Sequence, residues 1–209
     1  MPHNPIVLLV RHGRTELNDP QRPKLRAWEN PPLDKRGILD AKMAAQLIKR
    51  YQPQMVYSSD LTRDLQTAQI LSQELGNIPF EVDYDLRTAN MGTLSGMDEK
   101  EAYPWVEKWY KQPWWQAPGG GESNNGFLQR FYPSFDTKFN LAKESEPYCP
   151  SVVVSHGRNL AAIHARCEMI PQERSLMPLP GGIMSVYLDD VGEMKTDFFG
   201  TTEPILSDV

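Results

Sequence analysis

Short apolar runs recur along the chain and predict the strands of a buried sheet. Residues 6–10 are all apolar, and residues 151–155 centre on three consecutive valines. Continuous runs of this kind are typical of strands that are covered on both faces. Shorter stretches predict further strands at 55–57 and 80–82, and a closing strand pair at 183–188 and 194–199 around Asp189 and Asp190.

Between these runs, apolar residues return every three or four positions, which is the period of a helix. The clearest pattern covers residues 36–51, where apolar residues from Ile38 to Ile48 share one face. A second helix is expected at 61–75, with N-cap chemistry in residues 58–60 and a stop at Gly76. Further helices are expected at 99–111, 127–143 and from 157 to about 167, with irregular segments at 19–35, 83–97 and 113–126.

The alternation of strands and helices predicts an α/β fold. We expect one domain over residues 1–209, a three-layer α/β/α sandwich with a mostly parallel central sheet. In such sheets ligands bind beyond the carboxyl ends of the strands. Two predicted strands lead directly into a histidine, His12 and His156. Both histidines are therefore expected at the ligand-binding edge.

Composition limits the class of partner. The net charge of −5 argues against a general nucleic-acid binder, so a small anionic substrate must be attracted by a few local cations. Cys149 and Cys167 are the only cysteines, too few for a disulfide scaffold. The apolar run at 6–10 is too short for a signal peptide or a membrane span. We expect a cytoplasmic protein that acts without membrane or nucleic acid, and the oligomeric state stays open.

The first candidate site follows the first predicted strand. A histidine at a strand end can present one ring nitrogen as a nucleophile, and Arg11 beside His12 offers a fork of donors for phosphoryl oxygens. Gly13 removes bulk where a phosphate could approach the backbone, and Thr15 and Asn18 add neutral donors. The alternative is a structural histidine beside a solvated arginine.

Two further residues could bind the same anion. Arg63 lies in the first turn of a predicted helix, where free N–H groups favour an anion and a cation alone is unfavourable. The alternative is a surface arginine paired with Asp60 or Asp64. His156 sits between a strand and a helix, followed by Gly157, whose backbone N–H could face the same anion. The alternative is a capping or core histidine.

Taken in order, these segments resemble the histidine phosphatase superfamily, also called the phosphoglycerate mutase-like family. The resemblance runs from residue 6 to about residue 161. Five ordered segments carry it: Arg11-His12-Gly13 with Thr15 and Asn18; residues 32–37; residues 58–61 with Arg63 and residues 66–68; residues 118–123, ending in Gly-Glu-Ser; and Val154-Ser155-His156-Gly157. No single segment is specific, but the ordered set is.

The resemblance implies the phosphoglycerate mutase-like fold and a role for each matching residue. His12 would attack phosphorus and carry the phosphoryl group, and water would then release it. The charge of the transition state would be neutralised by Arg11, Arg63 and His156. The phosphate would also be held by Asn18, Thr15 and the Gly157 amide. No metal and no other cofactor is implied, and the partner is a small phosphorylated substrate.

One position departs from the family pattern. The family usually carries a glutamate after a Leu-Arg pair, where it protonates the leaving oxygen; here Leu86-Arg87 is followed by Thr88. A threonine hydroxyl is too weak an acid for this step. Another carboxylate could substitute (Glu122, Asp85 or Asp98, with Glu122 the candidate weighed against a plain loop role). Otherwise the enzyme is slow or restricted to good leaving groups, or the protein only binds phosphate esters.

An aromatic segment lies where the family places a variable cap. Within this segment of about 98–126, residues 103–115 hold four of the five tryptophans. Residues 103–115 could form a lid that recognises the substrate, or they could be core or dimer-contact residues. We expect a phosphatase acting on a small phosphate monoester. A phosphomutase is the alternative, although its usual Glu-Arg-His-Tyr-Gly segment is absent at 88–92.

Overall fold

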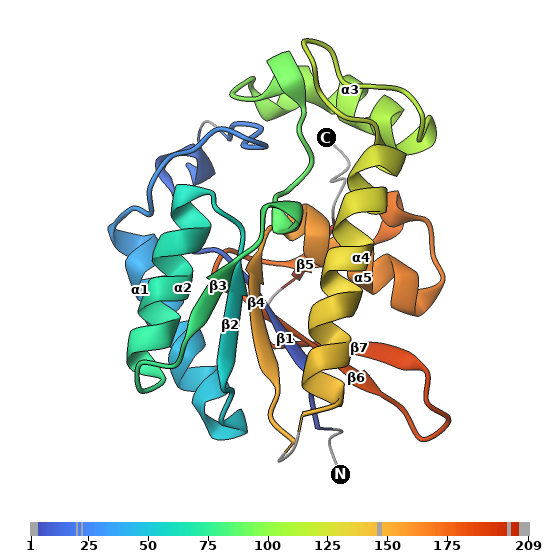
Figure 1. Cartoon of the computed structure of the whole chain (residues 1–209). Helices are drawn as coiled ribbons and strands as arrows, with labels where there is room; N and C mark the ends of the chain where they lie inside the picture. Colours follow the sequence, from blue (N-terminus) through green and yellow to red (C-terminus); the bar gives the residue numbers. More distant parts are fainter. Residues whose placement is uncertain (1–3, 20, 22, 146–147, 200–201, 205–209) are drawn as a thin grey trace.

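A computed structural model describes residues 4–19, 21, 23–145, 148–199 and 202–204. Its centre is a six-stranded sheet in the order β3-β2-β4-β1-β6-β7 (Figure 1). The sheet strands are β1 (Val7–Arg11), β2 (Met55–Ser58), β3 (Phe80–Val82), β4 (Ser151–Ser155), β6 (Ile183–Leu188) and β7 (Met194–Phe199). A separate antiparallel ribbon joins β5 (Leu176–Pro178) to β8 (Thr202–Pro204).

Parallel pairing dominates the sheet, as predicted. Strands β1 and β4, β4 and β2, and β2 and β3 are parallel, while β6 pairs antiparallel with β1 and β7 with β6. In the β1–β4 register Arg11 lies opposite Ser155. The residues that follow, His12 and His156, therefore emerge side by side at one edge of the sheet.

Five helices are present among the described residues. They are α1 (Lys35–Ile48), α2 (Thr62–Glu74), α3 (Glu99–Lys111), α4 (Asn124–Lys143) and α5 (Gly157–Glu168). Short 3-10 turns add to the connections at Glu16–Asn18, Lys49–Tyr51, Tyr84–Leu86, Gly92–Leu94 and Gln172–Arg174. In the part of the chain that the structure describes, no helix is long and apolar enough to cross a membrane.

Alternate residues of β1 enter two separate cores. Leu8 and Val10 pack in a cluster that includes Ala45 and Ile48 of α1 and the apolar face of α2. Val7 and Leu9 belong to the other cluster, with the aromatic residues of α4 and the apolar residues of α5. Because a strand presents successive side chains to opposite faces, this division gives three layers. The predicted α/β/α sandwich is confirmed.

The buried face of α1 is the expected one except at its first turn. Ile38 is exposed, and the helix instead buries its small residues, among them Gly37 and Ala41, together with Ile48. A side chain on Gly37 would place its Cβ 2.1 Å from the Arg14 carbonyl oxygen. The first turn of α1 thus lies against the backbone that follows β1. This approach excludes large side chains, so Gly37 and not Ile38 is buried at the start of the helix, whereas the rest of the predicted face is buried as expected.

Two helix starts also differ from expectation. The N-cap of α2 is Leu61, which has no side-chain cap. Just before it, the Ser59 hydroxyl accepts the Leu61 N–H at 3.3 Å, and Asp60 pairs with Arg87. Helix α4 begins at Asn124 rather than at 127, where the Ser123 hydroxyl accepts the Gly126 N–H. Figure 1 shows α3 at the same end of the sheet as the carboxyl ends of the parallel strands.

Gly37→Ala tests the close approach of α1. Gly37 and Gly126 occupy the same third helical position, and each donates its N–H to an N-cap side chain. Alanine at 126 meets only ordinary contacts at 3.4 Å or more. We expect Gly37→Ala to lower the free energy of unfolding by about 1–3 kcal/mol. Gly126→Ala should leave it unchanged or raise it by up to about 1 kcal/mol. Urea denaturation checks both, and equal effects would contradict the packing.

Candidate active site

Neighbouring strands bring two histidines together. His12 follows β1 and donates its backbone N–H to the Ser155 carbonyl at 2.9 Å. His156 follows β4 and is the N-cap residue of α5. The two ring centroids are 5.3 Å apart, in an edge-to-face arrangement. The pairing of β1 with β4 therefore determines the separation of the histidines.

Hydrogen bonds define the orientation of the His12 ring. Its Nδ1 lies 2.7 Å from the Gly13 carbonyl oxygen, and its Nε2 lies 3.1 Å from Arg63 Nε. A guanidinium group only donates, so Nε2 accepts and the ring proton sits on Nδ1, where it bonds to the carbonyl. The ring therefore presents the Nε2 lone pair to the arginine. This is the state required of a nucleophile.

Arg63 is held in the site by the loop between β1 and α1. Its Nη1 donates to the Glu29 carbonyl at 2.6 Å, and its Nη2 to the Ala27 carbonyl at 2.9 Å. Ala27 adopts a φ of 39°, an unusual conformation for alanine, so this carbonyl is presented at a cost in backbone strain. Arg63 is a buried residue, 3.7 Å from Asp64 Oδ2, and the surface ion pair considered from the sequence is wrong.

Arg11 approaches the same site from β1. Its Nη1 donates to the Pro178 carbonyl in β5 at 2.8 Å. A Cβ on Gly157 would lie 3.2 Å from Arg11 Cζ and 2.3 Å from the sulfur of Met177. Glycine at 157 therefore makes room for the guanidinium group. The structure brings together Arg11, His12, Arg63, His156 and Gly157, and the first four residues are at most 3% exposed.

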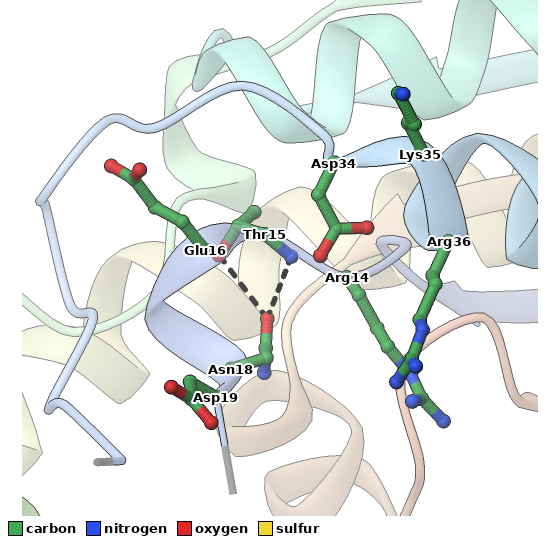
Figure 2. A pocket seen from close by; sticks show the side chains of 8 residues that line it. All are labelled: Arg14, Thr15, Glu16, Asn18, Asp19, Asp34, Lys35 and Arg36. Atoms are coloured by element: carbon green, nitrogen blue, oxygen red, sulfur yellow. Dashed lines mark hydrogen bonds between the residues drawn. The ribbon is translucent and has the colours of Figure 1, made fainter. Parts of the chain in front are cut away.

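Thr15 and Asn18 lie in a pocket separate from the cluster of Arg11, His12, Arg63 and His156. The Asn18 side-chain oxygen accepts both the backbone N–H and the hydroxyl of Thr15, at 3.0 and 3.2 Å (Figure 2). Both residues line a cavity of about 420 Å³ that none of the four buried site residues lines. Its charged lining is balanced between Arg14, Lys35, Arg36 and Glu16, Asp19, Asp34 (Figure 2). Their role in binding phosphate stays a prediction.

Burial and the arginines keep both histidines neutral. Burial, followed by the charges of Arg63 and Arg11, lowers the pKa of His12 well below its usual 6.5. Burial, Arg63 and His12 lower the pKa of His156 in the same direction. A buried imidazolium beside two guanidinium groups would add a third cation without water. His12 is therefore available as a nucleophile at neutral pH.

Several motif residues assemble the site without facing it. Thr67 accepts the Gly13 N–H at 3.2 Å and donates to the Arg63 carbonyl at 2.7 Å. A Cβ on Gly13 would lie 2.2 Å from the Gly37 carbonyl oxygen, so this glycine is required by helix packing rather than by phosphate approach. The motif thus fixes the backbone that carries His12.

The position of the missing acid is held by an ion pair. Arg130 of α4 donates to both carboxylate oxygens of Glu122, at 2.6 and 3.1 Å, and to the carbonyl of Thr88 at 2.8 Å. The Asn90 N–H adds a 2.6 Å bond to Glu122. These donors occupy both oxygens of the Glu122 carboxylate and tie it to the backbone near position 88. Glu122 therefore has the loop-fastening role considered from the sequence.

Asp98 and Asp85, the other two carboxylates considered as substitute acids, have a capping role and an exposed position, respectively. Asp98 caps α3 by accepting the Lys100 N–H at 3.0 Å. Asp85 is exposed on the 3-10 turn Tyr84–Leu86. Trp28 donates its indole N–H to the Thr88 carbonyl at 2.8 Å. Position 88 is thus fastened from two sides, by Trp28 and by Arg130.

Sequence reasoning missed the carboxyl group nearest to the histidines. Asp64 is completely buried, and its Oδ2 lies 3.4 Å from His156 Nε2. An aspartate in the first turn of a helix is ordinarily a solvated dipole partner, so its position gave no warning. The one hint in the sequence was its neighbour Arg63, which was already a candidate site residue. Adjacent residues in the first turn of a helix can both face inwards.

A family comparison agrees with this geometry. The model of the histidine phosphatase superfamily (branch 1) matches residues 7–188, most of the chain. This chain belongs to that superfamily. The match includes all the residues gathered at the sheet edge, and so the family resemblance found in the sequence is confirmed.

Individual relatives include mutases and a phosphatase. The chain is similar to the 2,3-bisphosphoglycerate-dependent phosphoglycerate mutase of Afipia carboxidovorans, with 29% identity over 93% of this chain and 98% of that protein. It is 32% identical to the probable phosphoglycerate mutase GpmB of Yersinia pestis, over 75% of this chain and 72% of that protein. The solved structure of a mycobacterial glucosyl-3-phosphoglycerate phosphatase with VO3 has a TM-score of 0.74 and 25% identity, covering 92% of this chain and 97% of that chain.

No metal-ligand cluster was found among the described residues. In residues 4–19, 21, 23–145, 148–199 and 202–204, no group of three or more His, Cys, Asp and Glu side chains is arranged to hold a metal ion. Cys149 and Cys167 are free thiols.

The protonation of His12 can be measured directly. Because burial and the two arginines lower its pKa well below 6.5, the ring should stay neutral, with its proton on Nδ1, as the pH falls from 8 to 6. Nitrogen-15 NMR of the histidine rings checks this, with His12→Gln assigning the signal. A ring that titrates at 6.5 or above, or that carries its proton on Nε2, would refute this assignment.

Proposed function

We propose that this protein is a metal-independent, cytoplasmic phosphatase that hydrolyses a small phosphate monoester through a phosphohistidine on His12. The observation that carries the proposal is the Arg63 Nε donor 3.1 Å from His12 Nε2, with His12 Nδ1 bonded to the Gly13 carbonyl. The Nε2 lone pair of His12 and the guanidinium group of Arg63 thus face each other at the same point of the site. A phosphoryl group entering between them would meet the nucleophile and its charge partner together.

The groups around His12 suit phosphoryl transfer. The transition state spreads negative charge over three equatorial oxygens, and its stabilisation requires positioned cations or donors. Arg11 and Arg63 supply two guanidinium groups, and His156 lies opposite the nucleophile. In the first step the P–O bond to the leaving group breaks as the N–P bond to Nε2 forms. In the second step water attacks phosphorus and restores His12.

The acid step distinguishes this chain from the family pattern. Thr88 cannot protonate an alkoxide leaving group, and Glu122 is engaged by Arg130 and by the Asn90 N–H. Substrates with acidic leaving groups need no such help. We therefore infer a preference for good leaving groups.

A mutase is the second candidate. The curated relatives named as mutases support it, because a mutase also forms a phosphohistidine. The segment at 88–92, without Glu or His, weighs against it. The phosphatase among the solved structures supports hydrolysis. A protein that binds phosphate esters and turns them over slowly remains the outcome if release of phosphate fails.

We also propose that residues 98–126 form the cap of a single 1–209 domain, because α3 lies at the ligand edge (Figure 1).

Phosphate release separates these functions. The substrates are p-nitrophenyl phosphate, whose leaving group needs little acid help, and an alkyl phosphate, whose leaving group needs it. We expect turnover of the aryl ester, and a loss of about 10³-fold or more in His12→Ala. Hydrolysis that survives in His12→Ala would refute the proposed nucleophile. No release of phosphate from either ester would favour the binding protein.

Thr88→Glu tests whether position 88 is the empty acid position. General acid catalysis contributes about 10²–10⁴-fold to a rate. Glutamate at position 88 should therefore raise alkyl ester turnover by about 10²-fold or more, with little effect on turnover of the aryl ester. Thr88→Gln is the matched control for size. Equal rates in the two variants would show that another group already donates the proton, and Glu122→Gln would then examine the remaining candidate.

A further inference from the structure

Asp64 is a buried carboxyl group that the proposed mechanism does not use. It lies on the first turn of α2 with no exposed surface. Its Oδ2 is 3.4 Å from His156 Nε2 and 3.7 Å from Arg63 Nε. Neither of its oxygens has a well-formed hydrogen bond. Burying a carboxyl group in this way is costly, so a compensating role is expected.

The two nitrogens of His156 face different groups. Nδ1 lies 3.3 Å from Arg63 Nη2, on the side of the site, whereas Nε2 faces Asp64 and the Ser59 hydroxyl, which is 3.3 Å away. A guanidinium group has no acceptor, so a neutral His156 carries its proton on Nε2 and points it towards Asp64. A bound phosphate would need a second proton, on Nδ1.

The surroundings of the pair determine where charge can reside. Burial raises the pKa of Asp64 to about 7, although Arg63 opposes the rise. Burial, and then Arg63 and His12, lower the pKa of His156. The other charged or titratable groups that act on the pair come from several elements: Arg11 of β1, Asp60 before α2 and Arg130 of α4. Near neutral pH the free site therefore holds a neutral imidazole beside a carboxyl group that exchanges between its acid and its carboxylate.

We propose that Asp64 is a positioning residue that orients His156 and stabilises its imidazolium form when a phosphoryl group is bound. The proposal rests on the proposed function. As the dianion enters, His156 takes a proton from water at Nδ1, and any proton on Asp64 leaves to water. The carboxylate then lies behind the ring, and the new N–H faces the phosphoryl oxygens. The imidazolium is thus placed between the carboxylate and the bound anion.

Asp64 would thereby allow His156 to become a third cation beside Arg11 and Arg63, where an imidazolium is otherwise disfavoured. Two guanidinium groups already act against an imidazolium at His156. A carboxylate 3.4 Å from Nε2 offsets part of that repulsion in a dry environment, where charge interactions are strong. The Asp64 carboxyl group touches neither the nucleophile nor the space in front of it in any described contact. Its two contacts inside the site are with His156 and, at a longer distance, with Arg63.

The test is the affinity for inorganic phosphate as a function of pH, measured by calorimetry on wild type and Asp64→Asn. The amide keeps the shape and can still accept from Nε2, but it provides no negative charge. We expect Asp64→Asn to bind phosphate about 10- to 100-fold more weakly at pH 7.5, the range for a hydrogen bond to a charged group. The difference should narrow as the pH falls, because protons then reach His156 from solution. Asp64→Glu should recover part of the affinity.

A double-mutant cycle distinguishes this role from a structural one. In a His156→Gln background, Asp64→Asn should have no further effect on phosphate affinity or should raise it slightly, because only a negative charge is lost. An equal loss in both backgrounds, or wild-type affinity in Asp64→Asn, would overturn the proposal and leave the phosphatase function standing. Wild-type protein that binds no phosphate would overturn both.

Folding of the variants is checked by unfolding across pH. The raised pKa of Asp64 means that its carboxyl group stabilises the fold at low pH and loses this contribution as the pH rises to about 7. Asp64→Asn should therefore be at least as stable as wild type above pH 7. Should the amide not fold, Asp64→Ala removes the carboxyl group without added bulk, and the same cycle applies.

Discussion

The site depends on one costly requirement, which is that ionisable side chains share a space closed to water. His12 must stay neutral while Arg63 lies 3.1 Å from its Nε2. Low dielectric surroundings make this possible, because they disfavour a further cation and leave the lone pair free. The same surroundings strengthen every interaction with an arriving anion. Burial therefore supplies both the nucleophile and the electrostatic stabilisation.

Much of the surrounding structure offsets the free-energy cost of burying these charged and polar groups. Carbonyl groups of the loop before α1 and of β5 accept from Arg63 and Arg11, so each guanidinium group keeps hydrogen bonds where it has lost water. Gly37 lets α1 approach the backbone after β1, and Thr67 fastens that backbone to α2. The Glu122–Arg130 pair fixes the loop at position 88 in the same manner. Motif residues that never face a phosphate thus determine the geometry of those that do.

Sequence patterns predicted the architecture because the fold relies on strong periodic signals. The continuous runs that became β1 and β4 gave the sheet, and the histidines at their ends gave the ligand edge. The patterns failed where packing used small or polar residues. Ile38 was placed inside although Gly37 lies there, and α2 buries Arg63 and Asp64 in addition to its apolar residues Ala68 and Leu71. The role of Asp64 depends on a neighbour far along the chain, His156, and no local pattern encodes such a contact.

The most direct measurement of the central claim is the site of phosphorylation. Protein mixed with p-nitrophenyl phosphate and quenched in base within milliseconds would be digested and examined by mass spectrometry. We expect acid-labile, base-stable phosphate on the His12 peptide, attached to Nε2, which is the ring nitrogen that faces Arg63. Phosphate on another residue, or release of product from a protein whose His12 is never labelled, would contradict it.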